Sequence, residues 1–479
     1  MALTKFTCSR CSRIPLKSNE DVTQILDFNR CFNWFPDFFS FTTALAFCNN
    51  SDLQRKRRQI LQKFTFPHAH SSLGTLLDQL CKDECQHLVA SIHQMQNGRQ
   101  DTKIDMKPLI RKACANIFSR YFCSVPRCDY DDKDFSDYTH NMDQVFWEIN
   151  NGRAVDFLPW LMPYFQHSSA MATMKESSQK VRSYVKGNII ATKRKARASN
   201  EGSEKKDADF LDSIMDYIDG KANGDPEALL TSQSALFALE DILGGHAAVA
   251  NIILRILHDL SLSDHVEAKT EVSKQLQNRP GSWDFVSSDE RQHLPWVVAA
   301  MHETIRMTCS PIVPHQAAQD STIGGNYNNR ANCDLSLMNS LIIGYLVPKD
   351  TVIFVNNHAL NMNEELWSTH SPEAYQPQRF LHPTTGEFSK PAHFQPFSMG
   401  KRSCVGYKMV HNVAFSLVSN LMMHFDIHSP AWAPENVPLG MLALPPEPFT
   451  FTLSPAVSCA TKTPLDSAPI PPLCIGTSA

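Results

Sequence analysis

Phe397-Ser-Met-Gly400-Lys-Arg402-Ser-Cys404-Val-Gly406 is the stretch that decides the fold and chemistry of this 479-residue chain. A cysteine ends a glycine-containing turn, and a long apolar helix is predicted directly after it. The positive end of that helix dipole and its free backbone N–H groups favour an ionised thiol. The two glycines let the backbone fold tightly against a flat ligand, and Arg402 can pair with an anionic group on it. The stretch therefore predicts a thiolate ligand to a metal, with a buried structural cysteine as the alternative.

The whole stretch resembles the cytochrome P-450 signature Phe-x-x-Gly-x-Arg-x-Cys-x-Gly at all five fixed positions. The resemblance implies an α+β, mainly α fold, with a large helical part and a small β-rich part. It also implies haem (heme, iron protoporphyrin IX) as the cofactor, with Cys404 as the catalytic metal ligand that pushes electron density toward O–O cleavage. The implied cofactor-binding residues of the turn are Phe397, Gly400, Arg402, Cys404 and Gly406.

Two further segments occur in the order that this family requires. Glu303-Thr-Ile-Arg306 matches Glu-x-x-Arg and places both charges on one helical face. Residues 372–380 resemble the region whose arginine, here Arg379, completes the ion pair. The resemblance implies a structural network of Glu303, Arg306 and Arg379, whereas an isolated Glu-x-x-Arg is usually an exposed helix pair.

The longest helical pattern covers residues 229–260 and is interrupted by Gly244-Gly245. Each glycine lowers helix stability by about 1 kcal/mol relative to alanine, so a packing or functional reason is needed. In the family, glycine at this place makes room for dioxygen, and an acid–alcohol pair relays protons. The resemblance implies that Gly244 and Gly245 are catalytic residues that open the oxygen pocket, but Ala247 and Ala248 occupy the acid and alcohol positions.

Several residues are candidates for relaying protons or for pairing with the haem propionates. Methyl groups cannot donate or relay protons, so ordered water, His246 or Asn251 replaces the usual relay, or the reaction does not need it. For His246 the alternative is a packed histidine that is hydrogen-bonded between helices. Arg57 and Arg58 are predicted cofactor-binding residues that pair with propionates, with a solvated basic face as their alternative.

The remaining pattern is mainly helical in the first two thirds of the chain. Helices are predicted at 74–96, 106–122, 141–150 and 290–307, and another resumes at Asp207. Residues 351–356 form a β-like run, and 442–455 a proline-rich hairpin. The charged stretch 193–206 is predicted to be a solvated surface loop.

The domain prediction is one haem-thiolate catalytic domain over residues 45–455. Residues 1–44 are expected to be an N-terminal segment that is truncated relative to the family and lacks its membrane anchor. Residues 326–344 are an unusual insertion, either an exposed loop or an unspliced intron. Residues 456–479 are expected to be a disordered C-terminal tail.

The composition gives further expectations about partners, compartment and metal sites. The net charge of −4 gives no indication of a nucleic-acid partner, and no apolar run is long enough to span a bilayer. The 14 cysteines are irregularly spaced and predict mostly free thiols in a reducing compartment. Zinc half-sites at Cys8-x-x-Cys11 and Cys81-x-x-x-Cys85 are the weaker alternative.

Several segments resemble the arthropod Spook-type members of the Halloween group, namely 146–150, 155–161, 244–248, 310–315 and 400–410. The resemblance implies a monooxygenase that acts on a hydrophobic, sterol-like ecdysteroid precursor, with 310–315 and 444–451 lining the pocket. Electrons would come from NADPH through cytochrome P-450 reductase, for which Lys401 and Lys408 are candidate contacts. The protein would associate peripherally with the cytosolic face of the endoplasmic reticulum membrane.

Two alternatives to this function stay open. A haem-thiolate isomerase or dehydratase would need no external electrons, which suits a chain without the acid–alcohol pair. A non-catalytic haem-binding remnant of a mis-assembled gene model is the other.

Overall fold

The computed structural model describes most of the chain between residues 51 and 456, together with the backbone of Leu26–Asp27. Within that span the description omits 69, 100, 151–160, 166, 200–207, 222–229, 280–284, 309–314, 318, 324–344, 354, 399–401 and 430–440. Apart from residues 26–27 and Ala456, the predicted N-terminal segment, the insertion and the tail therefore lie outside the described residues.

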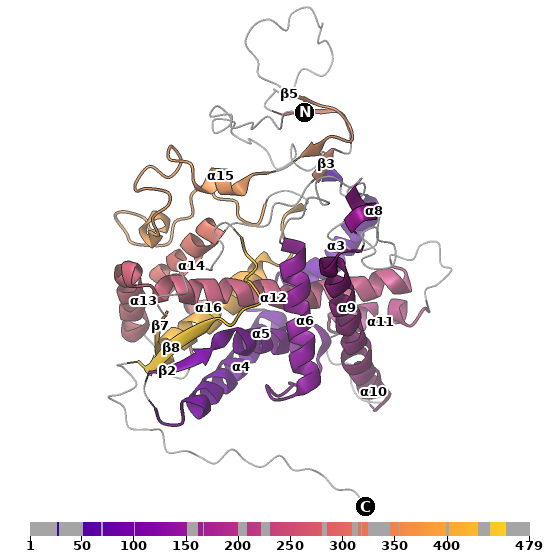
Figure 1. Ribbon diagram of the computed structural model, residues 1–479, viewed down its shortest axis with the longest axis horizontal. Helices are drawn as coiled ribbons and strands as arrows, with labels where there is room; N and C mark the ends of the chain where they lie inside the picture. Colours follow the sequence, from indigo (N-terminus) through magenta and orange to yellow (C-terminus); the bar gives the residue numbers. More distant parts are fainter. Residues whose placement is uncertain are drawn as a thin grey trace, which may run out of the picture.

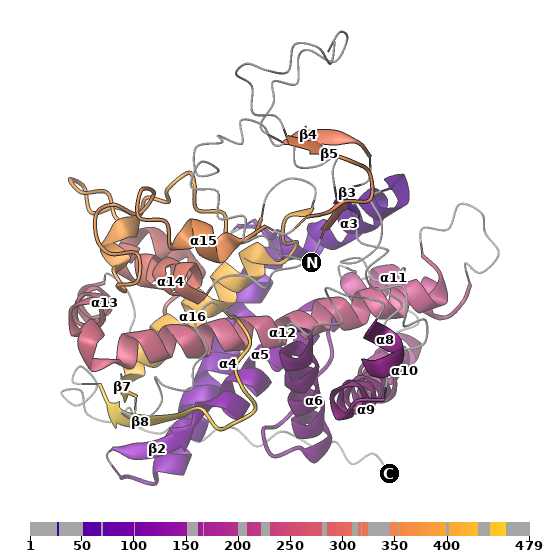
Figure 2. The same cartoon turned by 45° about the horizontal axis from the view of Figure 1, so that its top comes forward.

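Helices make up the larger part of the fold, and most of them pack around one long central helix, α12 (Figures 1 and 2). The α-helices are α3 (Asp52–Thr65), α4 (Ser72–Gln96), α5 (Met106–Cys123), α6 (Lys133–Asn150), α8 (Met162–Phe165), α9 (Ser169–Tyr184), α10 (Ala191–Ser199), α11 (Phe210–Ile218), α12 (Ser232–Ser261), α13 (Val266–Asn278), α14 (Pro295–Thr308), α15 (Asn357–Asn361) and α16 (Tyr407–His424). A π-helix, η3 (Val185–Ile190), joins α9 to α10, and the 3-10 helices are η4 (Ser263–His265), η5 (Ser288–His293) and η8 (Pro377–Phe380).

Local sequence explains where several of these helices begin and end. Ser71 caps α4 by accepting a hydrogen bond from the Gly74 amide, and Asn97 ends the same helix in the left-handed conformation. Thr231 and Ser234 form a capping box at the start of α12. These caps satisfy backbone groups that have no partner inside the helix.

The central helix α12 is buried along most of its length because neighbouring helices pack on it from several sides. It contacts α5, α6, α11, α14 and α16. Among the described helices, α12 alone is long and apolar enough to cross a bilayer, and two thirds of that apolar stretch is buried within the fold. The predicted helix over 229–260 is confirmed, and Gly244-Gly245 lie inside it without a break.

Within the part of the chain that the structure describes, the β-rich part consists of three small antiparallel sheets. The strands are β1 (Leu26–Asp27), β2 (Thr102–Asp105), β3 (His315–Ala317), β4 (Ser321–Ile323), β5 (Tyr345–Val347), β6 (Val352–Ile353), β7 (Phe425–His428) and β8 (Thr450–Pro455). Their orders are β1-β3-β6, β2-β8-β7 and β4-β5. The hairpin prediction for 442–455 is wrong, because the described part of this segment holds one strand that pairs with β2 and β7.

The loop prediction for 193–206 is wrong where the structure describes it, because residues up to Ser199 continue the helix α10. Lys193 is buried, and its ammonium group lies 2.5 Å from Asp209 and 2.8 Å from Asp212. Arg197 also binds Asp212, at 2.9 Å. The basic side chains of α10 thus pair with acidic groups that follow later in the chain, and this pairing offsets the cost of packing them.

The helix before η3, α9, is bound to α12, whereas α10 is bound to the start of α11. Arg182 of α9 forms two hydrogen bonds of 2.8 Å with Glu240 of α12, and its guanidinium group lies over the Phe237 ring. A bidentate arginine–carboxylate pair fixes orientation as well as distance. The π-helix η3 therefore separates a segment bound to α12 from a segment bound to α11.

Candidate functional site

The turn before α16 places Cys404 just before the N-terminal end of that helix. The Cys404 amide donates a hydrogen bond of 2.8 Å to the Phe397 carbonyl, which closes the turn. Ser398 has a φ of 60°, a left-handed conformation that non-glycine residues rarely adopt, so the turn is tight. Gly406 is the N-cap residue of α16. Gly400 falls outside the described residues.

Solvent reaches the Cys404 side chain, so the residue counts as exposed. Protein atoms nevertheless surround the sulfur on most sides, and its thiol is therefore largely desolvated. This burial raises the pKa of the Cys404 thiol, whereas the Gly406 and Tyr407 amides and the Arg58 charge lower it. The helix end acts in the predicted direction, but desolvation has the larger effect. A metal cation bound to the sulfur would ionise it outright.

Arg58 of α3 reaches the turn from a distant part of the chain. Its guanidinium group donates a short hydrogen bond to the Ser403 carbonyl and a second one, of 3.3 Å, to the Ser403 hydroxyl. Arg402 lies close enough for its charge to act on Arg58. Two cationic groups thus stand beside the cysteine, as pairing with two carboxylates would require.

Arg57 lies elsewhere on α3. It lines a cavity between α3, α11 and α12, whose other lining residues are Ile60, Leu61, Phe210, Ile214, Leu230, Ser234 and Ala238. The structure therefore brings Arg58 to the turn and directs Arg57 toward that cavity.

One stripe of α12 stays accessible in the middle of an otherwise buried helix. Between Ile242 and His258, the residues that are not fully buried are Gly244, Gly245 and Ala248. Positions separated by three and four residues share a helical face, and the exposed Asp241 lies on the same face. The stripe has almost no side-chain bulk, so it can lie close to a flat or rigid ligand.

The two glycines also have a packing role, and it differs between them. A Cβ at Gly244 would lie 3.3 Å from the Met142 sulfur, whereas a Cβ at Gly245 would lie 3.1 Å from the Phe118 ring. A methionine side chain adjusts easily, but Phe118 is packed against Phe122 at 5.6 Å between ring centroids.

We therefore expect Gly244→Ala to be neutral or stabilising, by up to about 1 kcal/mol, because alanine favours the helix and Met142 can move. Gly245→Ala should be less stable than Gly244→Ala, since the Phe118 ring must shift. Urea unfolding of the two variants measures the difference. Equal stabilities, or the reverse order, would contradict this account.

His246 and Asn251 lie within the helix packing. His246 is fully buried, its Nδ1 lies 2.7 Å from the Leu243 carbonyl, and its ring packs against Tyr138 of α6 at 5.6 Å. Asn251 donates to the Ala247 carbonyl (2.8 Å) and to Asp143 (3.2 Å). Both side chains thus use hydrogen bonds within or between helices.

Burial makes several histidines disfavour the charged form. It lowers the pKa of His246, His258 and His302 to about 4 each, from an ordinary value of 6.5. Between these values the unfolded chain binds more protons than the folded one, so stability falls as the pH drops from 6.5 toward 4. Asp259 acts in the opposite direction, since burial raises its pKa to about 6.

When the pH is lowered from about 7 to about 5, we expect the free energy of unfolding to fall less in His246→Leu than in the wild type. The variant lacks the imidazole that takes up a proton when the wild-type chain unfolds. The comparison between the two proteins cancels the contribution of Asp259 and other carboxyl groups. Free energies of unfolding in urea at both pH values provide the measurement. Parallel losses in the two proteins would show that His246 does not titrate in this way.

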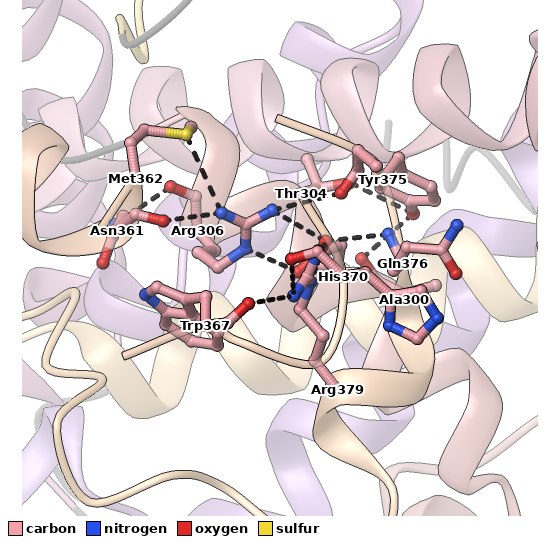
Figure 3. Close-up of polar contacts among 12 residues, drawn as sticks. Ala300, Thr304, Arg306, Asn361, Met362, Trp367, His370, Tyr375, Gln376 and Arg379 are labelled. Atoms are coloured by element: carbon pink, nitrogen blue, oxygen red, sulfur yellow. Dashed lines mark hydrogen bonds and ion pairs between the residues drawn. The ribbon is translucent and has the colours of Figure 1, made fainter. Parts of the chain in front are cut away.

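The ion network predicted from Glu303, Arg306 and Arg379 is present as a buried cluster (Figure 3). Glu303 and Arg306 are fully buried and joined by two hydrogen bonds, of 2.7 and 2.8 Å, and Arg379 lies 3.4 Å from Glu303. Arg306 also donates to the Asn361 carbonyl, at 2.7 Å. The Gln376 amide binds Glu303 at 2.8 Å. The network thus fixes α14 against the segment that follows α15.

Sequence reasoning missed a second buried ion cluster. Asp143 of α6 lies 3.0 Å from Lys107 and 2.9 Å from Arg111, both of α5. Asn251 links this cluster to α12, and its side-chain oxygen accepts the Leu444 amide at 3.2 Å. The members come from four separate segments, so no local motif could have shown the cluster.

The described site fits the haem that the sequence resemblance implies. An accessible cysteine sulfur is a suitable axial ligand to haem iron, and Arg58 and Arg402 supply cations for the propionates. The stripe of Gly244, Gly245 and Ala248 is a partly accessible surface on the otherwise buried middle of α12. Within the described residues no group of three or more His, Cys, Asp and Glu side chains forms an alternative metal site.

The chain matches known proteins over most of its length. The family model described as Cytochrome P450 matches residues 27–453. Cytochrome P450 307a1 of Drosophila melanogaster is 29% identical over 485 residues, which cover 94% of this chain and 81% of the relative.

Vertebrate relatives are more distant. Cytochrome P450 2J5 of Mus musculus is 25% identical over 361 residues, covering 74% of this chain and 64% of the relative. Steroid 17-alpha-hydroxylase/17,20 lyase of Mesocricetus auratus is 23% identical over 404 residues, covering 81% of this chain and 70% of the relative. Relatives with a steroid-directed name thus occur beside the insect one.

Proposed function

Because this chain belongs to the cytochrome P450 family of haem-thiolate monooxygenases, we propose that it oxidises a sterol-like substrate with dioxygen and electrons from NADPH. The electrons come through a separate reductase. The observation that carries the proposal is the accessible Cys404 at the start of α16, with two cationic side chains beside it. The steroid-directed name of one relative and the match to an insect family member support a sterol-like substrate.

Each part of the site has a separate task in this proposal. Cys404 would hold the haem iron through its sulfur, and the bound haem would supply the oxidative chemistry. Arg58 and Arg402 hold the propionates, while Phe397 closes the turn behind the sulfur through its carbonyl group. Gly244 and Gly245 form, in this proposal, the part of the α12 surface that oxygen and substrate approach, because neither carries a side chain.

The substrate is held mainly by apolar contact, because the accessible part of α12 from Gly244 to Ala248 carries no polar side chain. A rigid, flat hydrocarbon skeleton buries much apolar surface and loses little conformational freedom on binding. Ala247 is fully buried and Ala248 has only a methyl group, so neither moves a proton. We propose ordered water as the proton source, because Asn251 and the Nδ1 of His246 are engaged in hydrogen bonds of the helix packing.

We also propose that the protein contacts a membrane surface and binds a reductase. Tyr164 of α8 is 81% exposed, and Ile149 at the end of α6 is exposed as well, which suits shallow contact with a membrane surface. Lys408 lies at the start of α16 with its ammonium group 5.3 Å from the Phe66 ring centroid. It stands near the Cys404 turn and is a candidate contact for an acidic reductase surface.

The proposal is tested with the purified full-length protein. Haem-loaded protein should show a reduced-CO band at about 450 nm, the mark of thiolate ligation. With NADPH and reductase it should convert a sterol such as 7-dehydrocholesterol into a product that carries one oxygen atom from labelled dioxygen. Haem-free protein without this band would overturn the proposal and indicate a non-catalytic remnant.

A second candidate function follows from Ala247 and Ala248. A chain without an acid–alcohol pair suits isomerisation or dehydration of an already oxygenated sterol, which needs no external electrons. Turnover of such a substrate without NADPH and reductase, and without uptake of labelled oxygen, would favour this function over monooxygenation.

A further inference from the structure

Two imidazole rings stack in parallel behind the cysteine turn. His302 of α14 and His411 of α16 have ring centroids 4.9 Å apart and an interplanar angle of 12°. His411 also meets Phe397 edge-on, at 5.3 Å and 76°. Phe397 in turn accepts the Cys404 amide through its carbonyl group. A continuous series of contacts therefore runs from α14 to the residue that carries the sulfur.

The inner ring of the stack is held firmly. His302 Nδ1 lies 2.7 Å from the Val298 carbonyl, so this nitrogen carries a hydrogen and donates it. Its ring is surrounded by aromatic side chains, with Phe388 at 4.5 Å and Phe380 at 5.6 Å between centroids. His302 directly precedes Glu303, so the stack links the buried ion network to the turn.

The charged groups that face the stack are cationic. Arg291 of η5 and Lys390 of the segment before the turn both act on His302 and His411 by their charge. His393 belongs to the same aromatic cluster, where it meets Trp367 at 4.6 Å. On α14, Glu303 is the acidic residue beside His302, and its carboxylate is engaged by Arg306 and Arg379.

At neutral pH both rings are uncharged. Burial lowers the pKa of His302 to about 4, and burial together with His302 lowers the pKa of His411 well below its ordinary value. A proton added to either ring would place a new positive charge near Arg291 and Lys390, and among the described groups that act on the two rings by charge none is a carboxylate. Acid therefore acts directly on the contact that supports Phe397.

We propose that His411 is a positioning residue for the Cys404 turn, backed by His302, and that protonation of this stack releases the turn. The inference rests on the proposed function, since its consequence is loss of the haem-thiolate bond. His411 acts through Phe397. The neutral, parallel stack holds the edge of the Phe397 ring, and a charged stack is pushed apart by the two neighbouring cations.

Two substitutions at His411 distinguish the effect of the ring contact from the effect of the ring's protonation. His411→Phe keeps an aromatic ring against Phe397 but cannot take up a proton, whereas His411→Leu removes the ring contact. His424→Phe is the matched control, because His424 lies at the opposite end of the same helix and its ring contacts Phe425. All proteins are compared as haem-loaded full-length chains.

The readout is the reduced-CO spectrum during acid titration, at about 450 nm for the intact thiolate bond. We expect His411→Phe to keep the band at neutral pH and to lose it about one pH unit or more below the wild type. His411→Leu should show a reduced band already at neutral pH, and His424→Phe should titrate like the wild type.

The outcomes separate this inference from the proposed function. A wild-type protein that never shows the band overturns the proposed function. A wild-type band together with an unchanged acid midpoint in His411→Phe overturns the positioning role. A shift of equal size in His424→Phe overturns it too, because a histidine of α16 far from the turn would then have the same effect.

Discussion

The Cys404→Ser protein is expected to lose both the reduced-CO band at about 450 nm and all measurable turnover. A serine hydroxyl does not ionise under these conditions and cannot donate electron density to iron as a thiolate does. The fold should persist, because the Cys404 side chain is exposed and its backbone amide still binds the Phe397 carbonyl. Absorbance of the reduced CO complex and oxygenated product are the two measurements.

Cys128→Ser is the matched control for this substitution. Cys128 is a free, half-buried thiol outside the turn, and its sulfur lies 3.4 Å from the Tyr184 hydroxyl, a contact that serine can keep as a hydrogen bond. The control should retain pigment and turnover. An active, pigmented Cys404→Ser protein would remove the basis for the whole functional proposal.

Glu303→Gln is expected to destabilise the fold by about 3–5 kcal/mol, the range found when one partner of a buried ion pair is removed. The substitution leaves Arg306 fully buried and Arg379 almost fully buried, without a negative charge between them. Arg306 retains its bond to the Asn361 carbonyl, but a neutral carbonyl compensates a buried charge only in part. Urea unfolding gives the free energy directly.

Glu176→Gln is the control for this second substitution. Glu176 also pairs with a cation, Lys180, at 2.7 Å, but both side chains are exposed, so its loss should have no measurable effect on unfolding. If Glu303→Gln were as stable as Glu176→Gln, the buried network would have no structural importance.

The family and the mainly α fold could be predicted because their signals are local in the sequence. The turn from Phe397 to Gly406 has fixed spacing, and the match of the family model over residues 27–453 confirms the family. The match to the insect protein, cytochrome P450 307a1, confirms the arthropod side of the resemblance. Helix α12 was predictable because its apolar residues repeat at helical spacing over many turns.

The errors arose where distant residues decide the structure. Lys193 lies in a stretch that looks like solvated loop, yet Asp209 and Asp212 return to pair with it. The strand β8 has no partner within 442–455, since β2 comes from a segment far earlier in the chain. Charge composition and proline content describe a segment alone and carry no information on such partners.

The site was only partly predictable for the same reason. Cys404 and Glu303 belong to motifs, whereas the approach of Arg58 to Ser403 depends on how α3 docks. The parallel stack of His302 and His411 joins two helices whose sequences give no sign of the contact. Motifs therefore predicted Cys404 as the ligand and found the ion network, which the structure contains, and tertiary packing decided what surrounds them.

The π-helix η3 sets the direction in which the basic side chains of α10 point. Each residue in a helix turns the chain by about 100°, so the additional residue in a π turn rotates everything after it relative to α9. Deleting one residue between Val185 and Ile190 would give a regular α-helix but turn Lys193 away from Asp209 while Arg182 still faced Glu240. The number of residues in this short segment, more than the identity of its exposed side chains, therefore determines which acidic partners the basic side chains of α10 meet.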